Sequence, residues 1–190
     1  MHIVGFNGSP RKEGNTYQAI KTVFEELEKE GATTELIQLG SSNIRGCRAC
    51  FKCFETKDNR CIQKDDLNGF VEQMVAADGI LIGSPTYFAN VSSEVKALID
   101  RAGLVSRANG NLFSRKAGAA VVAARRAGAV NVYQNINLFF GIGNMIVPGS
   151  SYWNIGIGRN PGEILKDEEG MKTFRDLGQN MAWLLKKLKG

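Results

Sequence analysis

The chain has 190 residues, of which 43% are hydrophobic and 23% charged, and its net charge is +5. This length and composition suit one globular domain with its own core, and four cysteines are too few for a disulfide-scaffolded miniprotein. The mild, scattered positive charge predicts no nucleic-acid partner, and the lack of a signal-peptide pattern or a bilayer-length apolar run predicts a cytoplasmic protein with no membrane partner.

Short apolar runs alternate with helical patterns along the chain. Five runs are expected to be strands, namely 2–6, 33–39, 79–85, 117–124 and 144–149. Apolar residues at helical spacing predict helices over 16–31, 65–78, 92–105, 130–143 and 170–189. Asp65 is the expected N-cap of the second of these helices.

Apolar strands separated by helices predict a parallel sheet that is covered on both faces. With right-handed crossovers, the pattern predicts an α/β fold, a doubly wound α/β/α sandwich of three layers and five strands, for which the flavodoxin-like strand order 2-1-3-4-5 is one of two common solutions. We expect a single domain over 1–190, with a cysteine-rich loop, 44–64, inserted after the second strand. The segment 149–169 is long for a connection, which favours a functional role.

The loop after the first strand, NGSPRKEGNT (7–16), has the composition of a phosphate site. Ser9, Arg11, Asn15 and Thr16 supply hydroxyl, amide and guanidinium donors, and the helix that follows favours an anion at its N-terminus. The loop matches neither the P-loop pattern nor the dinucleotide fingerprint G-x-G-x-x-G, so a monophosphate ester fits better. The alternative is a plain polar turn between strand and helix.

The loops after the third and fourth strands are expected to reach the same crevice. The segment GSPTYFANVS (83–92) offers stacking faces and backbone polar groups to a flat aromatic ligand, although such aromatic residues more often serve packing. The residues concerned are Pro85, Thr86, Tyr87, Phe88 and Asn90. In AARRAG (123–128), Gly128 allows close backbone approach, and Arg125 and Arg126 could face negative charge on the ligand.

All four cysteines lie in GCRACFKCFETKDNRC, as Cys47, Cys50, Cys53 and Cys61. The C-x-x-C-x-x-C spacing lets one loop wrap three corners of a [4Fe–4S] cluster, and a fourth thiolate closes the site. The polar stretch 54–60 is long enough to fold back, so all four cysteines can serve one cluster.

Other readings of the cysteines remain open. Zinc usually takes two separated knuckles or a mixture of cysteine and histidine, and three thiolates within seven residues suit it poorly. A thioredoxin-type dithiol at Cys47/Cys50 or Cys50/Cys53 leaves two cysteines unexplained. Free thiols are also possible, because relatives without a cluster can retain similar cysteines.

Taken together, these motifs resemble a known family. GSPRKEGNT and GSPTYFANVSSEVKALIDRAG are similar to the signature loops of the flavodoxin-like NAD(P)H-dependent FMN reductase superfamily. The cysteine motif and MIVPGSSYWNIGIG extend the likeness to the iron–sulfur flavoproteins within it, over nearly the whole chain. The resemblance implies FMN, with the phosphate on the first loop and the ring bordered by the other two. The implied FMN-binding residues are Ser9, Arg11, Asn15, Thr16, Pro85, Thr86, Tyr87, Phe88, Asn90, Arg125, Arg126 and Gly128.

The resemblance also implies an activity, that of an FMN- and [4Fe–4S]-containing electron-transfer oxidoreductase. Its implied partners are a ferredoxin-type donor or NAD(P)H and a small-molecule acceptor such as dioxygen or hydrogen peroxide, in a dimer or tetramer. No side chain is expected to act as nucleophile or general base, because the cofactors carry the chemistry. The alternatives are a cluster-free NAD(P)H-dependent FMN or quinone reductase, a non-catalytic flavin-binding electron carrier and, more remotely, a zinc-stabilised binding protein.

Overall fold

The computed structural model describes residues 1–189, so Gly190, the last residue of the expected domain, lies outside the described residues. The strands are β1 (His2–Asn7), β2 (Thr33–Gln38), β3 (Gly79–Pro85), β4 (Ala117–Ala124) and β5 (Ile155–Ile157). The helices are α1 (Asn15–Lys29), α2 (Lys52–Thr56), α3 (Leu67–Ala76), α4 (Ser93–Ala108), α5 (Ala129–Ile142), the 3₁₀ helix η1 (Glu163–Lys166) and α6 (Glu168–Lys189). None of the helices in residues 1–189 combines the length and the apolar character that crossing a bilayer requires.

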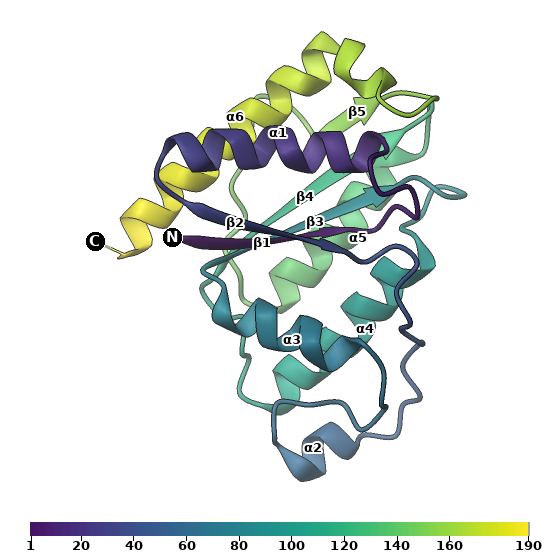
Figure 1. Ribbon diagram of the computed structural model, residues 1–190. Coiled ribbons are helices and arrows are strands. Elements are labelled where there is room, and N and C mark those ends of the chain that lie inside the picture. Colours follow the sequence, from purple (N-terminus) through teal and green to yellow (C-terminus); the bar gives the residue numbers. More distant parts are fainter. Residues whose placement is uncertain (190) are drawn as a thin grey trace.

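The five strands form one parallel sheet in the order β2-β1-β3-β4-β5. Helices α1 and α6 cover one face, and α3, α4 and α5 cover the other (Figure 1). Every residue of β4 is buried, as a strand packed on both faces requires. The predicted flavodoxin-like, doubly wound fold is therefore confirmed, strand order included.

Two apolar layers hold the helices to the sheet. On one side, Phe24 of α1 and Leu177 of α6 are buried against the sheet, and on the other Phe113 and Phe140 are. Gly5 in β1 allows α1 to lie close, because a Cβ at this position would meet the Phe24 ring at 2.5 Å. These layers bury the three central strands, β1, β3 and β4, and leave their ends open to ligands.

The fifth strand is not where the sequence pattern predicts it. In the expected segment 144–149, only Ile146 bridges to Ala117, and the chain then leaves the sheet near Pro148, which has no N–H to donate. It returns as β5, which pairs with the end of β4. Between the two contacts, the Asn154 side chain donates to the Ala120 carbonyl at 3.0 Å and takes the place of a backbone bond. The apolar run therefore contributes one bridge, and a later segment forms the strand.

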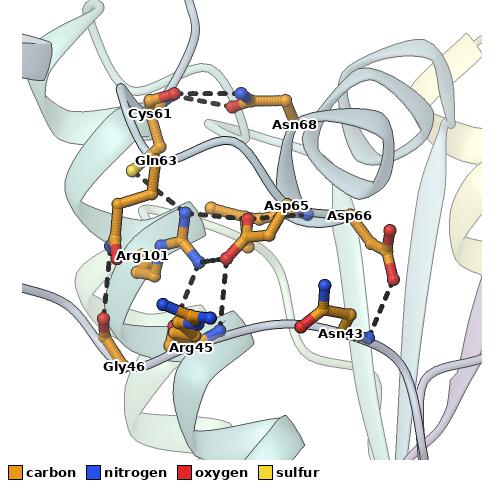
Figure 2. Close-up of polar contacts among 10 residues, drawn as sticks. Asn43, Arg45, Gly46, Cys61, Gln63, Asp65, Asp66, Asn68 and Arg101 are labelled. Carbon is orange, nitrogen blue, oxygen red and sulfur yellow. Dashed lines mark hydrogen bonds and ion pairs between the residues drawn. The ribbon is translucent and has the colours of Figure 1, made fainter.

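The cysteine loop is fixed to α4 by a buried ion pair (Figure 2). Arg101 is 1% exposed and donates to both oxygens of Asp65, at 2.5 and 3.0 Å, and to the Arg45 carbonyl at 3.0 Å. Burial raises the pKa of Asp65, but the hydrogen bonds from Arg101 and from the Arg45 amide outweigh it, so that pKa lies below its usual value. Asp65 is thus not the N-cap of α3, which is Asp66.

We predict that Asn154→Ala destabilises the sheet edge by about 1–3 kcal/mol, because the buried Ala120 carbonyl loses its partner. Urea unfolding followed by circular dichroism measures the change. Asn135→Ala, which removes an exposed bond within α5, is the matched control and should cost less than about 0.5 kcal/mol. Equal effects of the two substitutions would contradict the role given to Asn154.

We predict that Asp65→Asn lowers the free energy of unfolding by about 3–5 kcal/mol at neutral pH, since Arg101 loses its buried counter-charge. Because the folded pKa of Asp65 is depressed, its contribution is complete above about pH 4 and is lost as the pH falls through the folded pKa. The gap between wild type and variant should therefore shrink on acidification, as denaturant titrations from pH 7 to pH 3 would reveal.

Asp100→Asn is the control for this titration, since its carboxylate forms an exposed pair with Lys96 on the same helix. It should change stability by less than about 1 kcal/mol. A gap between wild type and Asp65→Asn that stays constant down to pH 3 would refute the electrostatic account.

Candidate functional site

A cavity of ≈150 Å³ opens where β1, β3 and β4 end. Its walls come from the loops that follow these strands and from the residues after β5. It is lined by Ser9, Arg11, Asn15, Thr16, Pro85, Thr86, Tyr87, Ala123, Ala124, Arg125, Gly158 and Arg159. The structure therefore brings together eight of the twelve residues that were predicted to bind flavin.

Hydrogen bonds from the ends of β1 and β2 hold the loop after β1 in shape. Asn7 is fully buried at the end of β1; its Oδ1 accepts from the Ser9 amide at 3.2 Å and its Nδ2 donates to Gln38 at 2.8 Å. Gln38 in turn donates to the Ser9 carbonyl at 2.6 Å. The Ser9 hydroxyl oxygen accepts from the Arg11 amide at 3.1 Å. These bonds fix the loop before any ligand enters.

The loop ends at a helix start that suits an anion. Helix α1 begins after Gly14, which provides no side-chain cap, and its first turn contains no acidic residue. Amide N–H groups at such an end point outward and carry partial positive charge. With Arg11 and the buried Thr16 on the same cavity, this wall of the site fits a phosphate.

Asn15 connects the first loop to the chain beyond β5. Its side-chain amide donates to the Gly158 carbonyl at 2.9 Å, and its oxygen accepts from the Ile164 amide at 3.3 Å. A Cβ at Gly158 would lie 2.6 Å from the Ile164 nitrogen, so glycine permits this approach. Gly158 and Arg159 were not predicted as site residues, and the unusual length of segment 149–169 was the only signal for them.

The loop after β3 forms a tight two-residue turn. Tyr87 and Asn90 exchange backbone bonds of 3.0 and 2.9 Å, and Phe88 and Ala89 between them have φ values of 48° and 58°. Phe88 is fully exposed at the tip. Pro85, Thr86 and Tyr87 line the cavity, whereas Phe88 and Asn90, which were also predicted to border the ring, do not.

The turn after β4 packs against that loop. Gly128 caps α5 with φ +84°, and a Cβ there would lie 3.0 Å from the Ala89 Cβ. Arg125 lines the cavity, but Arg126 is exposed outside it and Gly128 acts through packing. The Thr86 amide and hydroxyl both donate to the Ala123 carbonyl, at 2.9 and 3.2 Å, and join the two strand ends.

All four cysteines line a second, small hollow of ≈20 Å³ beside α4. Cys53 lies in the short helix α2, which the sequence pattern did not predict, and is 7% exposed, whereas Cys47 and Cys50 are exposed. Burial raises the pKa of the Cys53 thiol, and the neighbouring Cys61 and Cys50 raise it further.

The backbone of this loop is strained. Ala49, Phe51, Lys57 and Asn59 all have positive φ values, between 50° and 61°. Such conformations cost of order 1–3 kcal/mol each in non-glycine residues and tend to occur at ligand clamps. The loop is therefore bent around the cysteine hollow at some cost in stability.

The donors around the hollow suit a thiolate-bound, anionic group. Four thiols and no carboxylate line it, together with Arg101, whose Nη2 donates to the Cys61 sulfur at 3.2 Å. The Arg101 Nε is a buried donor with no partner. Across residues 1–189, no group of three or more His, Cys, Asp and Glu side chains is arranged to hold a metal ion. The chemistry of the hollow fits an iron–sulfur group, although the thiols must draw together to bind one.

A wider cleft of ≈850 Å³ lies between the loop after β1 and the chain that leaves the cysteine loop. Three basic residues line it, Lys12, Arg60 and Lys64, together with Asp65 and Asp66. Asp65 already pairs with Arg101 and Arg60 with Glu72, so the charges that remain on the cleft are those of Lys12, Lys64 and Asp66.

Comparison with known proteins identifies the family of this chain. The model of the family described as NADPH-dependent FMN reductase matches residues 1–160. An iron–sulfur flavoprotein of Methanocaldococcus jannaschii is 36% identical, with 100% of both chains covered. One of Methanosarcina thermophila is 34% identical over 97% of this chain and 95% of its own.

Solved structures agree on the fold. RosB, crystallised with 8-demethyl-8-formylriboflavin-5'-phosphate, superposes with a TM-score of 0.80 at 20% identity, covering 100% of this chain and 80% of that one. An archaeal flavodoxin superposes with a TM-score of 0.60 at 14% identity, covering 97% and 98%.

The cavity at the strand ends, the match over residues 1–160 and the full-length relatives agree with one another. They make the protein an FMN-dependent oxidoreductase. The chain belongs to the NADPH-dependent FMN reductase family and, within it, to the iron–sulfur flavoproteins.

Proposed function

We propose that the cavity at the strand ends holds FMN, with its phosphate on the loop after β1 and its ring between the loops after β3 and β4. The observation that carries this proposal is that eight residues selected as flavin ligands from the sequence line this one cavity. Arg11 and the α1 N-terminus neutralise the phosphate. Asn15 fixes the wall that Gly158 forms.

When bound, FMN supplies chemistry in steps of one or two electrons. The chain's part is to bind, orient and shield it. Tyr87 is 48% exposed and can still cover an aromatic ring, and Arg125 places positive charge near the cavity. Phe88 and Asn90 shape the turn that carries Tyr87, and Gly128 lets the next turn pack on it. Arg126 lies outside the cavity, so we give it no contact with the ring.

We propose that Cys47, Cys50, Cys53 and Cys61 hold a [4Fe–4S] cluster. Three observations support this: the four thiols line one hollow, a buried guanidinium lies beside them, and the aligned relatives are named iron–sulfur flavoproteins. A cluster there would exchange single electrons with a donor and with FMN. The four unpaired thiols also favour a reducing compartment such as the cytoplasm.

We propose a small acidic protein of the ferredoxin type as electron donor, with dioxygen or hydrogen peroxide as acceptor. The basic side chains Lys12 and Lys64 of the wide cleft support an acidic partner that docks beside the cysteine loop, and Arg60 on the same cleft pairs with Glu72. NAD(P)H is the alternative donor that the family name indicates.

We also propose that the chain forms dimers or tetramers, in which a second subunit brings a cluster near each flavin.

A cluster-free NAD(P)H-dependent FMN or quinone reductase is the second candidate. The observation that favours it is that the thiols are not arranged to hold a metal among the described residues. Anaerobic purification with assays of iron, sulfide and FMN separates the two candidates. Turnover of a reductant and an acceptor separates either one from a non-catalytic flavin carrier.

We predict that Arg11→Gln weakens FMN binding about 10- to 100-fold, because a charged hydrogen bond to phosphate contributes about 1.5–3 kcal/mol. Quenching of flavin fluorescence on titration measures the change. Riboflavin, which lacks the phosphate, should bind the variant and the wild type equally. Lys12→Gln alters the neighbouring residue, which lines the wide cleft instead, and should leave FMN binding unchanged. Equal losses for FMN and riboflavin would refute the phosphate assignment.

We predict that Cys53→Ser loses most of its iron and sulfide and keeps its FMN, because it removes one thiolate ligand and leaves the cavity at the strand ends intact. Iron, sulfide and flavin analysis after anaerobic reconstitution measures both. Thr56→Ala, in the same short helix, is the control and should keep its iron. If a folded Cys53→Ser protein lost FMN together with iron, the two sites would not be separate.

A further inference from the structure

Arg101 is the largest side chain that the fold buries completely among the described residues. It lies on α4, whose other buried side chains include Val95, Leu98 and Ala102. Burying an arginine is costly unless its charge is paired and its donors are bonded. A cost of this size at one position calls for a role that an apolar residue could not fill.

The Arg101 guanidinium donates its hydrogen bonds to the cysteine loop and to Asp65, which follows it. Four of its five N–H groups are used: two on Asp65, one on the Arg45 carbonyl and one on the Cys61 sulfur. The fifth donor, Nε, is buried without a partner, and the side chain lines the cysteine hollow. The bonds to Arg45 and Asp65 close the two ends of the loop, as Figure 2 shows.

Cys61 is held more firmly than the two exposed cysteines, Cys47 and Cys50. Its amide donates to the Asn68 Oδ1 at 2.8 Å, its carbonyl accepts from the Asn68 Nδ2 at 2.9 Å, and its sulfur accepts from Arg101 at 3.2 Å (Figure 2). Cys47 and Cys50 are exposed, and Cys47 receives only a bond of 3.4 Å from the Ala49 amide. The fourth thiol, separated from the others in sequence, is thus placed before any ligand binds.

We propose that Arg101 is the positioning residue of the cysteine site: it fixes the Cys61 sulfur and places a buried positive charge and N–H donors against the group that the four thiols bind. This inference rests on the proposed iron–sulfur function and names a residue outside the cysteine motif that serves it. Asp65 acts with Arg101 as its counter-charge and orients the guanidinium through two bonds.

Removing the charge of Arg101 and removing the charge of Asp65 should shift the reduction potential of the bound iron–sulfur group in opposite directions. Positive charge and hydrogen bonds to sulfur stabilise the reduced, more negative form of an iron–sulfur group and therefore raise its potential. Arg101→Gln removes both and should lower the potential. Asp65→Asn removes the negative charge behind the guanidinium and should raise it. A residue that served only the stability of the fold would not give shifts of opposite sign.

The test uses the full chain, reconstituted anaerobically with iron and sulfide and loaded with FMN. The variants are Arg101→Gln, Arg101→Lys, Asp65→Asn and the double variant Arg101→Gln/Asp65→Asn. Arg107→Gln, an exposed arginine on the same helix, is the matched control. FMN stoichiometry and circular dichroism establish that each variant folds. The readouts are the potential, from an electron paramagnetic resonance titration, and the rate of iron loss to a chelator.

Removing a side chain that hydrogen-bonds a metal ligand typically lowers metal affinity about 10- to 100-fold, so we expect Arg101→Gln to lose iron faster than wild type by about the same factor. Arg101→Lys keeps the positive charge, so its reduction potential should lie close to that of wild type. It should still lose iron faster than wild type. The double variant is decisive, because it leaves no buried charge without a counter-charge. It should be more stable than Asp65→Asn alone and nevertheless lose iron faster than wild type.

Iron retention equal to wild type in the double variant would overturn the proposal, as would an unchanged potential in Arg101→Gln. If the wild type itself binds no iron, the cluster part of the proposed function fails and this inference fails with it. If the wild type binds iron and the variants at position 101 match Arg107→Gln, only this inference fails. If Arg101→Gln does not fold, the double variant and Arg101→Lys still decide the question.

Discussion

The parallel sheet imposes the constraint on which the rest of this molecule depends. Because each crossover returns the chain to the same edge, the carboxyl ends of β1, β3, β4 and β5 all meet there. Both faces of the sheet are buried, so this edge is where polar loops can approach one another without covering the core. Loops separated by well over a hundred residues, such as those that contain Asn15 and Gly158, therefore share one cavity.

The cysteine loop is held in place by a different interaction, because no sheet edge supports it. It is a long excursion after β2 with several left-handed residues and one short helix, and the buried pair of Arg101 and Asp65 fixes it to the body. Helix α4 serves both sites. It begins just after the turn that carries Tyr87, and Arg101 follows eight residues later, about 12 Å along the helix. A rigid helix of this kind holds the two sites at a constant separation.

The cavity at the strand ends was largely predictable from the sequence, and the surroundings of the cysteines only in part. Ser9, Arg11 and Thr16 could be selected because a polar loop between a buried strand and a helix must lie at the sheet edge. Phe88 was selected for its aromatic ring, but two residues with positive φ turn it outward at the tip of a tight turn. Composition shows that an aromatic residue is present in a loop, whereas the backbone turn decides where the ring points.

By itself the sequence determined the layered fold, the loop that suits phosphate and the grouping of four thiols, since all of these follow from local periodicity and spacing. The strand order was one of two that the pattern allowed, and the resemblance of the loops to a flavodoxin-like family favoured it. The tertiary structure alone decided where β5 pairs, because Ile146 and the apolar residues around it suit a strand equally well until Pro148 ends the ladder. It also decided that Arg101, an ordinary helix residue in the sequence, meets Asp65 and Cys61. Side chains that lie 36 and 40 residues apart leave no periodic trace, because only packing brings them together.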